Sequence, residues 1–167
     1  MNLTLVTNQI EKVAEQATKT RYLEQGHNLT GKGAASIHAQ TTTRGNDTVI
    51  TVYAADYVYI LNRGVPAARI PYSQGSGATT SKYIDGLQNY AKLRFGLSDK
   101  EALSVAFQIA RKQKAQGMPT IASQRFSKTG KRTGFVNDAI LDVIKELKPT
   151  IGKLIFKSIS QKQIEGR

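Results

Sequence analysis

Apolar residues recur every three or four positions along much of this chain, a spacing that predicts helices with one buried face. The first such run lies within residues 1–26. Its apolar stripe consists of Leu3, Val6, Ile10, Val13 and Ala17. A second helix is predicted over residues 81–95. A third begins at Ser98, which stands three positions before Glu101 in the spacing of a capping box, and stops at Gly117.

A further helix is predicted from Phe135 onward. Its apolar positions are Val136, Ala139, Ile140, Val143, Ile144 and Leu147. Pro149 has no N–H to donate, so we expect the helix to break or kink after Lys148. Residues 150–163 then read either as another helix or as a helix that gives way to a short strand near Ile159, and the pattern leaves both open.

A β-hairpin is predicted where the spacing changes to alternation. Residues 37–43 are rich in threonine, and residues 48–54 carry apolar side chains on both faces, with Gly45 and Asn46 in the turn between them. A strand that is apolar on both faces is typical of one that is covered on both sides. We therefore expect the second strand to be buried.

The remaining segments read as connections. Residues 55–64 favour a short helix that ends at Gly64, and residues 26–36 form a linker. The loop over residues 64–80 holds two of the four prolines and is long for a compact domain. Residues 120–134 form a basic connection. The pattern as a whole predicts an α+β fold in one domain, 1–167: a small antiparallel sheet against three to four helices, with a protruding loop.

Composition narrows the class of protein. The chain has no cysteine, which excludes disulfides and thiolate chemistry. No apolar run is long enough to span a bilayer and the start does not resemble a signal peptide, so we expect a soluble protein without membrane contact. The last four residues, 164–167, match a protease site used to remove fusion tags, and no function rests on them.

Charge is concentrated in the last third of the chain. The net charge is +12, and residues 111–167 contribute +9 of it, from 13 basic and 4 acidic residues. Such a face suits an anionic partner, with nucleic acid first and an acidic protein surface second. The basic side chains of the 120–134 connection are the candidates. They are Arg125, Lys128, Lys131 and Arg132.

Motifs for catalysis or cofactor binding do not appear in the sequence. Gly75 and Gly77 precede Lys82, but their spacing fits neither a P-loop nor a dinucleotide fingerprint. His27 and His38 stand outside metal-ligand patterns, and the carboxylates do not cluster. We expect neither an enzyme nor a bound cofactor or metal.

Residues 53–119 resemble the neck and tail-completion (head–tail joining) proteins of tailed bacteriophages, and are most similar to neck-ring proteins of crAss-like phages. The shared features are a Pro-Tyr entry, an aromatic-bearing helix, an A-F-x-I-A-x-K helix and a Gly-x-Pro exit. The residues are Pro71, Tyr72, Tyr83, Ala106, Phe107, Ile109, Ala110, Lys112, Gly117 and Pro119. The chain departs from the family's E-x-G-T pattern at residues 62–65, which leaves open which ring of the neck it would form.

The resemblance implies a structural virion protein without catalytic activity, made in the bacterial host cytoplasm. It implies a homo-oligomeric ring, twelvefold, that links the portal to the adjacent neck or tail rings and surrounds the passing double-stranded DNA. The 64–80 loop is then an assembly arm, and its expected interface residues are Arg63, Gly64, Pro66, Arg69, Pro71 and Tyr72. The basic connection would line the lumen or meet an acidic surface. The alternative is a basic accessory protein that binds nucleic acid without sequence preference.

Overall fold

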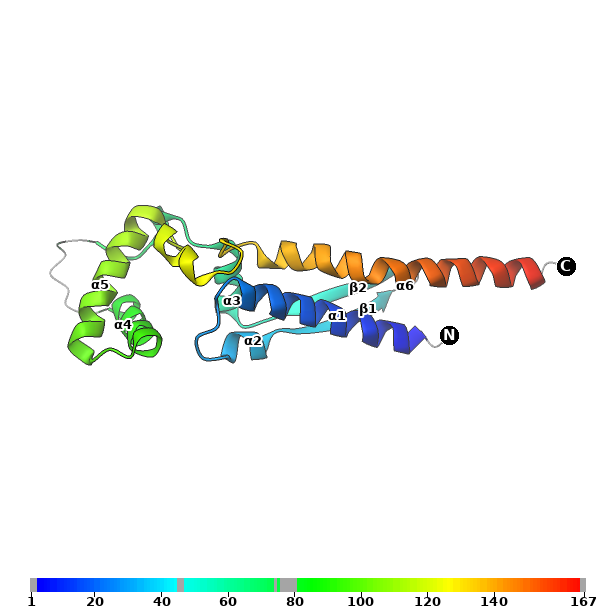
Figure 1. Ribbon diagram of the computed structural model, residues 1–167, viewed down its shortest axis with the longest axis horizontal. Helices are drawn as coiled ribbons and strands as arrows, with labels where there is room; N and C mark the ends of the chain where they lie inside the picture. Colours follow the sequence, from blue (N-terminus) through cyan, green and yellow to red (C-terminus); the bar gives the residue numbers. More distant parts are fainter. Residues whose placement is uncertain (1–2, 45–46, 74, 76–80, 166–167) are drawn as a thin grey trace.

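The computed structural model describes residues 3–44, 47–73, 75 and 81–165. The molecule is elongated, and two bodies lie end to end along its long axis (Figure 1). The long body contains helix α1 (Leu3–Glu24), the hairpin and helix α6 (Phe135–Glu165). The short body contains helices α4 (Lys82–Phe95) and α5 (Asp99–Gln116), which pack against each other. The α+β class is confirmed.

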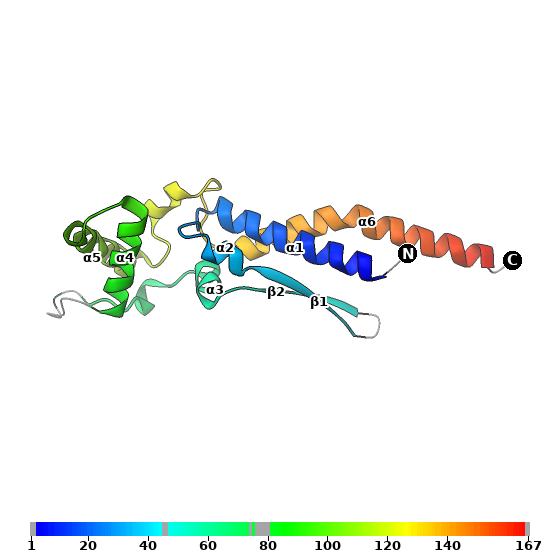
Figure 2. The same cartoon turned by 90° about the horizontal axis from the view of Figure 1, so that it is seen from below.

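Helix α1 is the centre of the long body. It packs against both α6 and the hairpin, and Figure 2 shows the three elements running alongside one another. Its buried residues follow a spacing of four: Ala14, Thr18 and Tyr22. Arg21 donates two hydrogen bonds to the carboxylate of Asp142 on α6, and these bonds lower the pKa of that carboxyl group. This paired, bidentate contact fixes the two helices in register.

The core of the long body lies where several elements meet. Tyr22, Ile37, Val58 and Phe135 form one buried cluster, and the rings of Tyr22 and Phe135 meet edge to face at 5.5 Å between centroids. Val58 comes from the short helix α3 (Asp56–Arg63), which confirms the predicted helical turns. Helix α2 (Lys32–Ser36) lies within the expected 26–36 linker.

The hairpin pairs β1 (His38–Arg44) with β2 (Asp47–Tyr53) in antiparallel register; the predicted turn residues Gly45 and Asn46 fall outside the described residues. Ala39 is buried, and Thr41 donates through its backbone N–H and its hydroxyl to Glu11 of α1. The paired residues of β2 share this face. The opposite face of the hairpin has no cover among the described residues.

The expectation of a buried second strand was wrong. Every residue of β2 is exposed, because the described sheet has two strands and α1 lies chiefly over β1. Val49 is 53% exposed and Tyr53 stacks only on His38. Ile50 and Val52, on the face towards α1, are each still 36% exposed, and the apolar residues of the other face have no cover within the described part of one chain.

The expected break at Pro149 and the alternative of a C-terminal strand were also wrong. Helix α6 runs from Phe135 through Pro149 to Glu165, as one continuous element that extends beyond the end of α1 (Figure 1). Proline removes one intrahelical hydrogen bond, which frees the carbonyl group four residues earlier. That residue, Lys145, is exposed, so water can satisfy its carbonyl group.

The short body follows its sequence signals closely. The Ser81 hydroxyl accepts from the N–H of Ile84 at the start of α4, and Gly96 ends this helix in the left-handed conformation. The predicted capping box of Ser98 and Glu101 opens α5. Ile84, Ala106 and Ala110 form the buried contact between the two helices.

The cluster around Phe135 predicts a large stability difference. Phe135 is fully buried, so Phe135→Ala should lower the free energy of unfolding by about 3–5 kcal/mol through lost contacts and a cavity. Ile121→Ala, at a residue that is 69% exposed, is the control and should change it by less than about 0.5 kcal/mol. Urea denaturation followed by circular dichroism measures both. If the two variants lowered the free energy of unfolding equally, Phe135 would not belong to the core.

Candidate functional site

The chain passes between the two bodies twice, and the two passages pair with each other. Val65 and Met118 exchange two backbone hydrogen bonds of 2.7 Å in an isolated antiparallel bridge. Gly64 and Gly117 flank it with φ of 73° and 83°, and a Cβ on either would lie within 2.7 Å of the facing carbonyl oxygen. Glycine is therefore required at both positions. We call this crossing the waist.

The predicted assembly arm begins at the waist, and its described part is docked rather than free. Residues 67–69 form the 3-10 helix η1 (Ala67–Arg69), which packs on α5. Ile70 is buried, and its carbonyl oxygen accepts from Lys114 Nζ at 3.1 Å. Tyr72 packs half-buried against the α4–α5 core. Gln74 and residues 76–80 of the expected loop fall outside the described residues.

The other predicted arm residues differ in their surroundings. Arg63, at the end of α3, is exposed and donates to the hydroxyl of Tyr59 at 2.9 Å. Pro66, Arg69 and Pro71 are exposed. Gly64 belongs to the waist itself. Contact with a neighbouring chain is therefore open to the exposed members of the predicted set and not to the whole of it.

The basic connection divides in the same way. Arg125, Lys128 and Lys131 are exposed, but the guanidinium of Arg132 points into the protein. It donates to the carbonyl oxygens of Ser123 and Gly26, at 3.0 and 3.3 Å. Arg132 thus joins the 3-10 helix η2 (Ile121–Phe126) to the segment that follows α1, so its guanidinium is less accessible to a partner than the exposed cations of the connection.

Further bonds attach the connection to the long body. The N–H of Lys128 donates to the carbonyl oxygen of Glu24 at 2.8 Å, and Gln25 Nε2 donates to that of Thr133. Asn62 accepts from the N–H groups of Gly134 and Val136. Hydrogen bonds therefore hold residues 127–134 against the long body, while the side chains of Lys128 and Lys131 are exposed.

Three arginine side chains lie around the ring of Phe126 at the junction of the two bodies. The guanidinium carbons of Arg94, Arg125 and Arg132 lie over its ring at 4.4, 4.8 and 5.8 Å from the centroid. Arg94 comes from α4, and Phe95 beside it contacts the Phe126 ring at 6.5 Å between centroids. Cation–π attraction thus contributes to holding the short body against η2.

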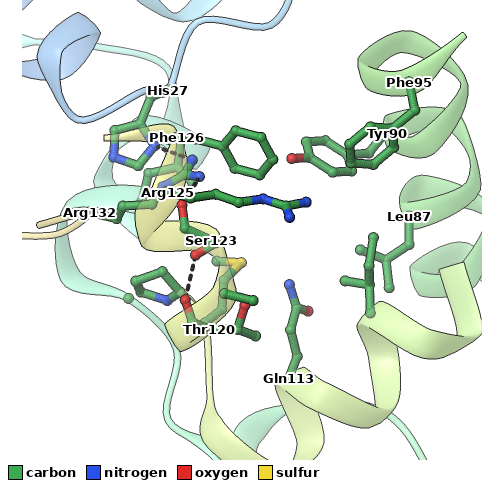
Figure 3. A pocket seen from close by; sticks show the side chains of 16 residues that line it. His27, Leu87, Tyr90, Phe95, Gln113, Thr120, Ser123, Arg125, Phe126 and Arg132 are labelled. Carbon is green, nitrogen blue, oxygen red and sulfur yellow. Dashed lines mark hydrogen bonds between the residues drawn. The ribbon is translucent and has the colours of Figure 1, made fainter. Parts of the chain in front are cut away.

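A cavity of about 310 Å³ opens beside this cluster. Figure 3 shows Arg125 reaching across it toward Leu87 and Tyr90 of α4, and Gln113 of α5 pointing into the same space. A second cavity of about 380 Å³ lies beside the 28–33 segment and shares His27, Tyr90 and Arg132 with the first, whereas Arg94 lines the second cavity.

His27 is the titratable group of this junction. It is 8% exposed, and burial together with the charge of Arg132 lowers its pKa to about 4. Arg132 Nη2 approaches His27 Nδ1 at 3.5 Å, so Nδ1 is the acceptor and the proton of the neutral ring sits on Nε2. Burial also raises the pKa of Tyr22 to about 12, so its hydroxyl stays protonated and donates to the carbonyl oxygen of His27.

Within the described residues, no group of three or more histidine or acidic side chains could hold a metal ion. No helix in that part of the chain is both long and apolar enough to cross a membrane. What the junction offers is a largely apolar hollow beside guanidinium groups. Such a hollow can bind a group through apolar contact and through attraction to the guanidinium groups.

Sequence analysis identified Arg125 and Arg132 but missed Arg94, Tyr90 and Gln113. The contacts of these three residues are tertiary, and each lies on a helix whose local pattern gave no reason to single it out. No family model, curated protein or solved structure matches this chain.

The buried histidine predicts a pH dependence of stability. The folded-state pKa of His27, about 4, lies below its ordinary value of 6.5, so the unfolded chain binds the proton more readily between these two values. The stabilisation is therefore present above pH 6.5 and is lost as the pH falls toward 4, by up to about 3 kcal/mol.

Urea denaturation at a series of pH values between 7.5 and 4.5 measures this loss. His27→Gln cannot titrate and should show a much flatter profile than wild type over this window. Profiles that fall in parallel would assign the pH dependence to other groups and contradict the lowered pKa.

Proposed function

We propose that this chain is a structural subunit of a homo-oligomeric ring in the head–tail connector of a tailed bacteriophage. The observation that carries the proposal is a pair of uncovered apolar surfaces on the long body. One lies on α6 and the other on β2, two elements that both pack against α1.

The surface on α6 faces away from the core. Ile140, Leu141 and Ile144 are each at least half exposed, whereas Ala139 and Leu147 on the same helix are buried against the long body. A helix that carries apolar residues on its exposed face as well as on its buried face is typical of one that packs against a second partner. A second neighbour on this face would come from another chain.

The surface on β2 belongs to a strand and not to a helix, so it differs from the surface on α6. Val49 and Tyr53 pair with Thr42 and His38 on the face of the hairpin turned away from α1. The strand also leaves its outer edge unpaired within the described sheet, and such edges invite another element to pair or pack there.

Two different surfaces on separate elements of a subunit favour head-to-tail contacts. A contact of this kind joins one surface of a copy to the other surface of the next, and it closes into a ring when the rotation allows. A twofold dimer would instead use the same patch twice. The resemblance of residues 53–119 to neck proteins points to the same class of assembly.

The partners follow from the same proposal. The ring would dock on the portal and on adjacent neck or tail rings, with Arg63, Arg69 and Pro71 as exposed contacts near the waist. Arg125, Lys128 and Lys131 remain exposed cations able to meet DNA phosphates or an acidic protein surface.

Cosedimentation with empty phage capsids tests this function. Wild type should pellet with capsids that carry a portal and not with capsids assembled without one. Ile144→Asp places a charge in the proposed subunit contact and should reduce pelleting at least about tenfold. Leu93→Asp is the matched control, because Leu93 on α4 is 54% exposed and Ile144 is 58% exposed.

Two results would contradict the proposal. One is equal pelleting of the two variants, which would remove α6 from the subunit contact. The other is a wild-type protein that ignores both kinds of capsid but binds free double-stranded DNA with a steep salt dependence, which is the behaviour of an accessory nucleic-acid-binding protein.

A further inference from the structure

The cavity at the junction of the two bodies has the composition of a site for an apolar group. It measures about 310 Å³, within the range of small-ligand pockets. Its apolar wall draws on both bodies and on the waist. The residues of this wall are Leu61, Leu87, Phe95, Ile109, Met118 and Phe126.

The charge around this cavity is of one sign. Arg94, Arg125 and Arg132 surround one ring, and none of them has a carboxylate partner among the described residues. The described residues that line the two cavities include no aspartate or glutamate. Repulsion between Arg94 and Arg132 contributes to lowering the pKa of Arg132, after burial. An anionic group would relieve this repulsion.

Further cations are exposed on the same basic connection. Lys128 and Lys131 are exposed on a segment that hydrogen bonds hold against the long body. Arg132, in contrast, is held by Ser123 and Gly26, so its charge is fixed in place before a partner arrives. A fixed cation loses little freedom on binding, which favours affinity.

The arrangement favours a peptide over a nucleic acid. Single strands bind to aromatic rings by stacking, which needs a ring with a free face. Here Arg94 and Arg125 already lie over Phe126, at 4.4 and 4.8 Å. What remains open is the hollow beside the ring, whose largely apolar wall can accept an apolar side chain.

We propose that this cavity binds an acidic segment of a partner protein, which inserts one large apolar side chain between Leu87 and Met118 while its carboxylates meet Arg94 and Arg125. The site uses neither the α6 surface nor the β2 surface, so it does not depend on the proposed ring.

A titration followed by NMR tests the site on the ¹⁵N-labelled full chain. The probe is the blocked peptide Asp-Glu-Phe-Glu-Asp, taken to about 2 mM so that weak binding is seen. Saturable shifts should appear at Leu87, Ile109 and Gln113. The same peptide with alanine in place of phenylalanine should bind at least about tenfold more weakly.

Three variants locate the contact. Arg125→Ala removes an exposed cation and should weaken the peptide about tenfold. Ala122→Trp fills the cavity from an exposed position on its wall and should abolish the shifts. Lys12→Ala, an equal loss of charge at an exposed position on α1, is the control and should change affinity less than about twofold.

The proposal is overturned if wild type shows no saturable shifts, or if the alanine peptide binds as well as the phenylalanine peptide. It is also overturned if Ala122→Trp, with an otherwise native spectrum, binds like wild type. Stronger binding of a single-stranded oligonucleotide at the same residues would assign the site to nucleic acid instead.

Discussion

The position of the two bodies depends on Arg132. Its guanidinium bonds carbonyl oxygens from two segments more than 80 residues apart in the chain, Gly26 and Ser123, and it lies over the ring of Phe126. A charge in such a half-buried place is costly unless it is hydrogen-bonded, and the buried Nε of Arg132 has no hydrogen-bond partner among the described residues. The cost explains why the surrounding backbone turns its carbonyl groups inward. Burial lowers the pKa of His27 and the charge of Arg132 lowers it further, so this side chain contributes to the bonds, the charge and the titration of the junction.

The two glycines of the waist complete this constraint. They let residues 64–66 and 117–119 approach closely enough for the Val65–Met118 bridge. Phe126, at the end of η2, then lies against the guanidinium of Arg94. The cavity lies where two bodies with separate cores meet, at this crossing, at this ring and at the hydrogen bond from Arg94 to the carbonyl oxygen of Asn28. Its apolar wall is therefore assembled from both bodies, and a ligand that fills it would also fix their relative position.

Local signals predicted the helices well and the surfaces poorly. The capping box at Ser98 and the glycine stop at Gly64 depend on neighbours in sequence, and both were found where expected. The strand β2 was expected to be buried because it is apolar on both faces, but a local pattern does not show which elements pack against a strand. Pro149 was misread because an exposed helix can leave a carbonyl group to water.

The candidate site shows the same limit. Arg125 and Arg132 were visible in sequence as basic residues, but nothing local distinguishes an outward cation from one that bonds Gly26. Arg94 was invisible, since its approach to Phe126 follows from the packing of α4 across the waist. The function proposed for the whole chain draws on the two uncovered surfaces, which appear only once the fold is known.

Disulfide trapping tests most directly whether neighbouring copies meet through these two surfaces. The chain has no cysteine, so Ile144→Cys and Val49→Cys each introduce a single thiol. A head-to-tail contact predicts that a mixture of the two variants on portal-bearing capsids forms disulfide-linked pairs containing one copy of each, and that neither variant alone does so. Efficient linkage of Ile144→Cys to itself would show a twofold contact between α6 helices, and would contradict a ring built from two different surfaces.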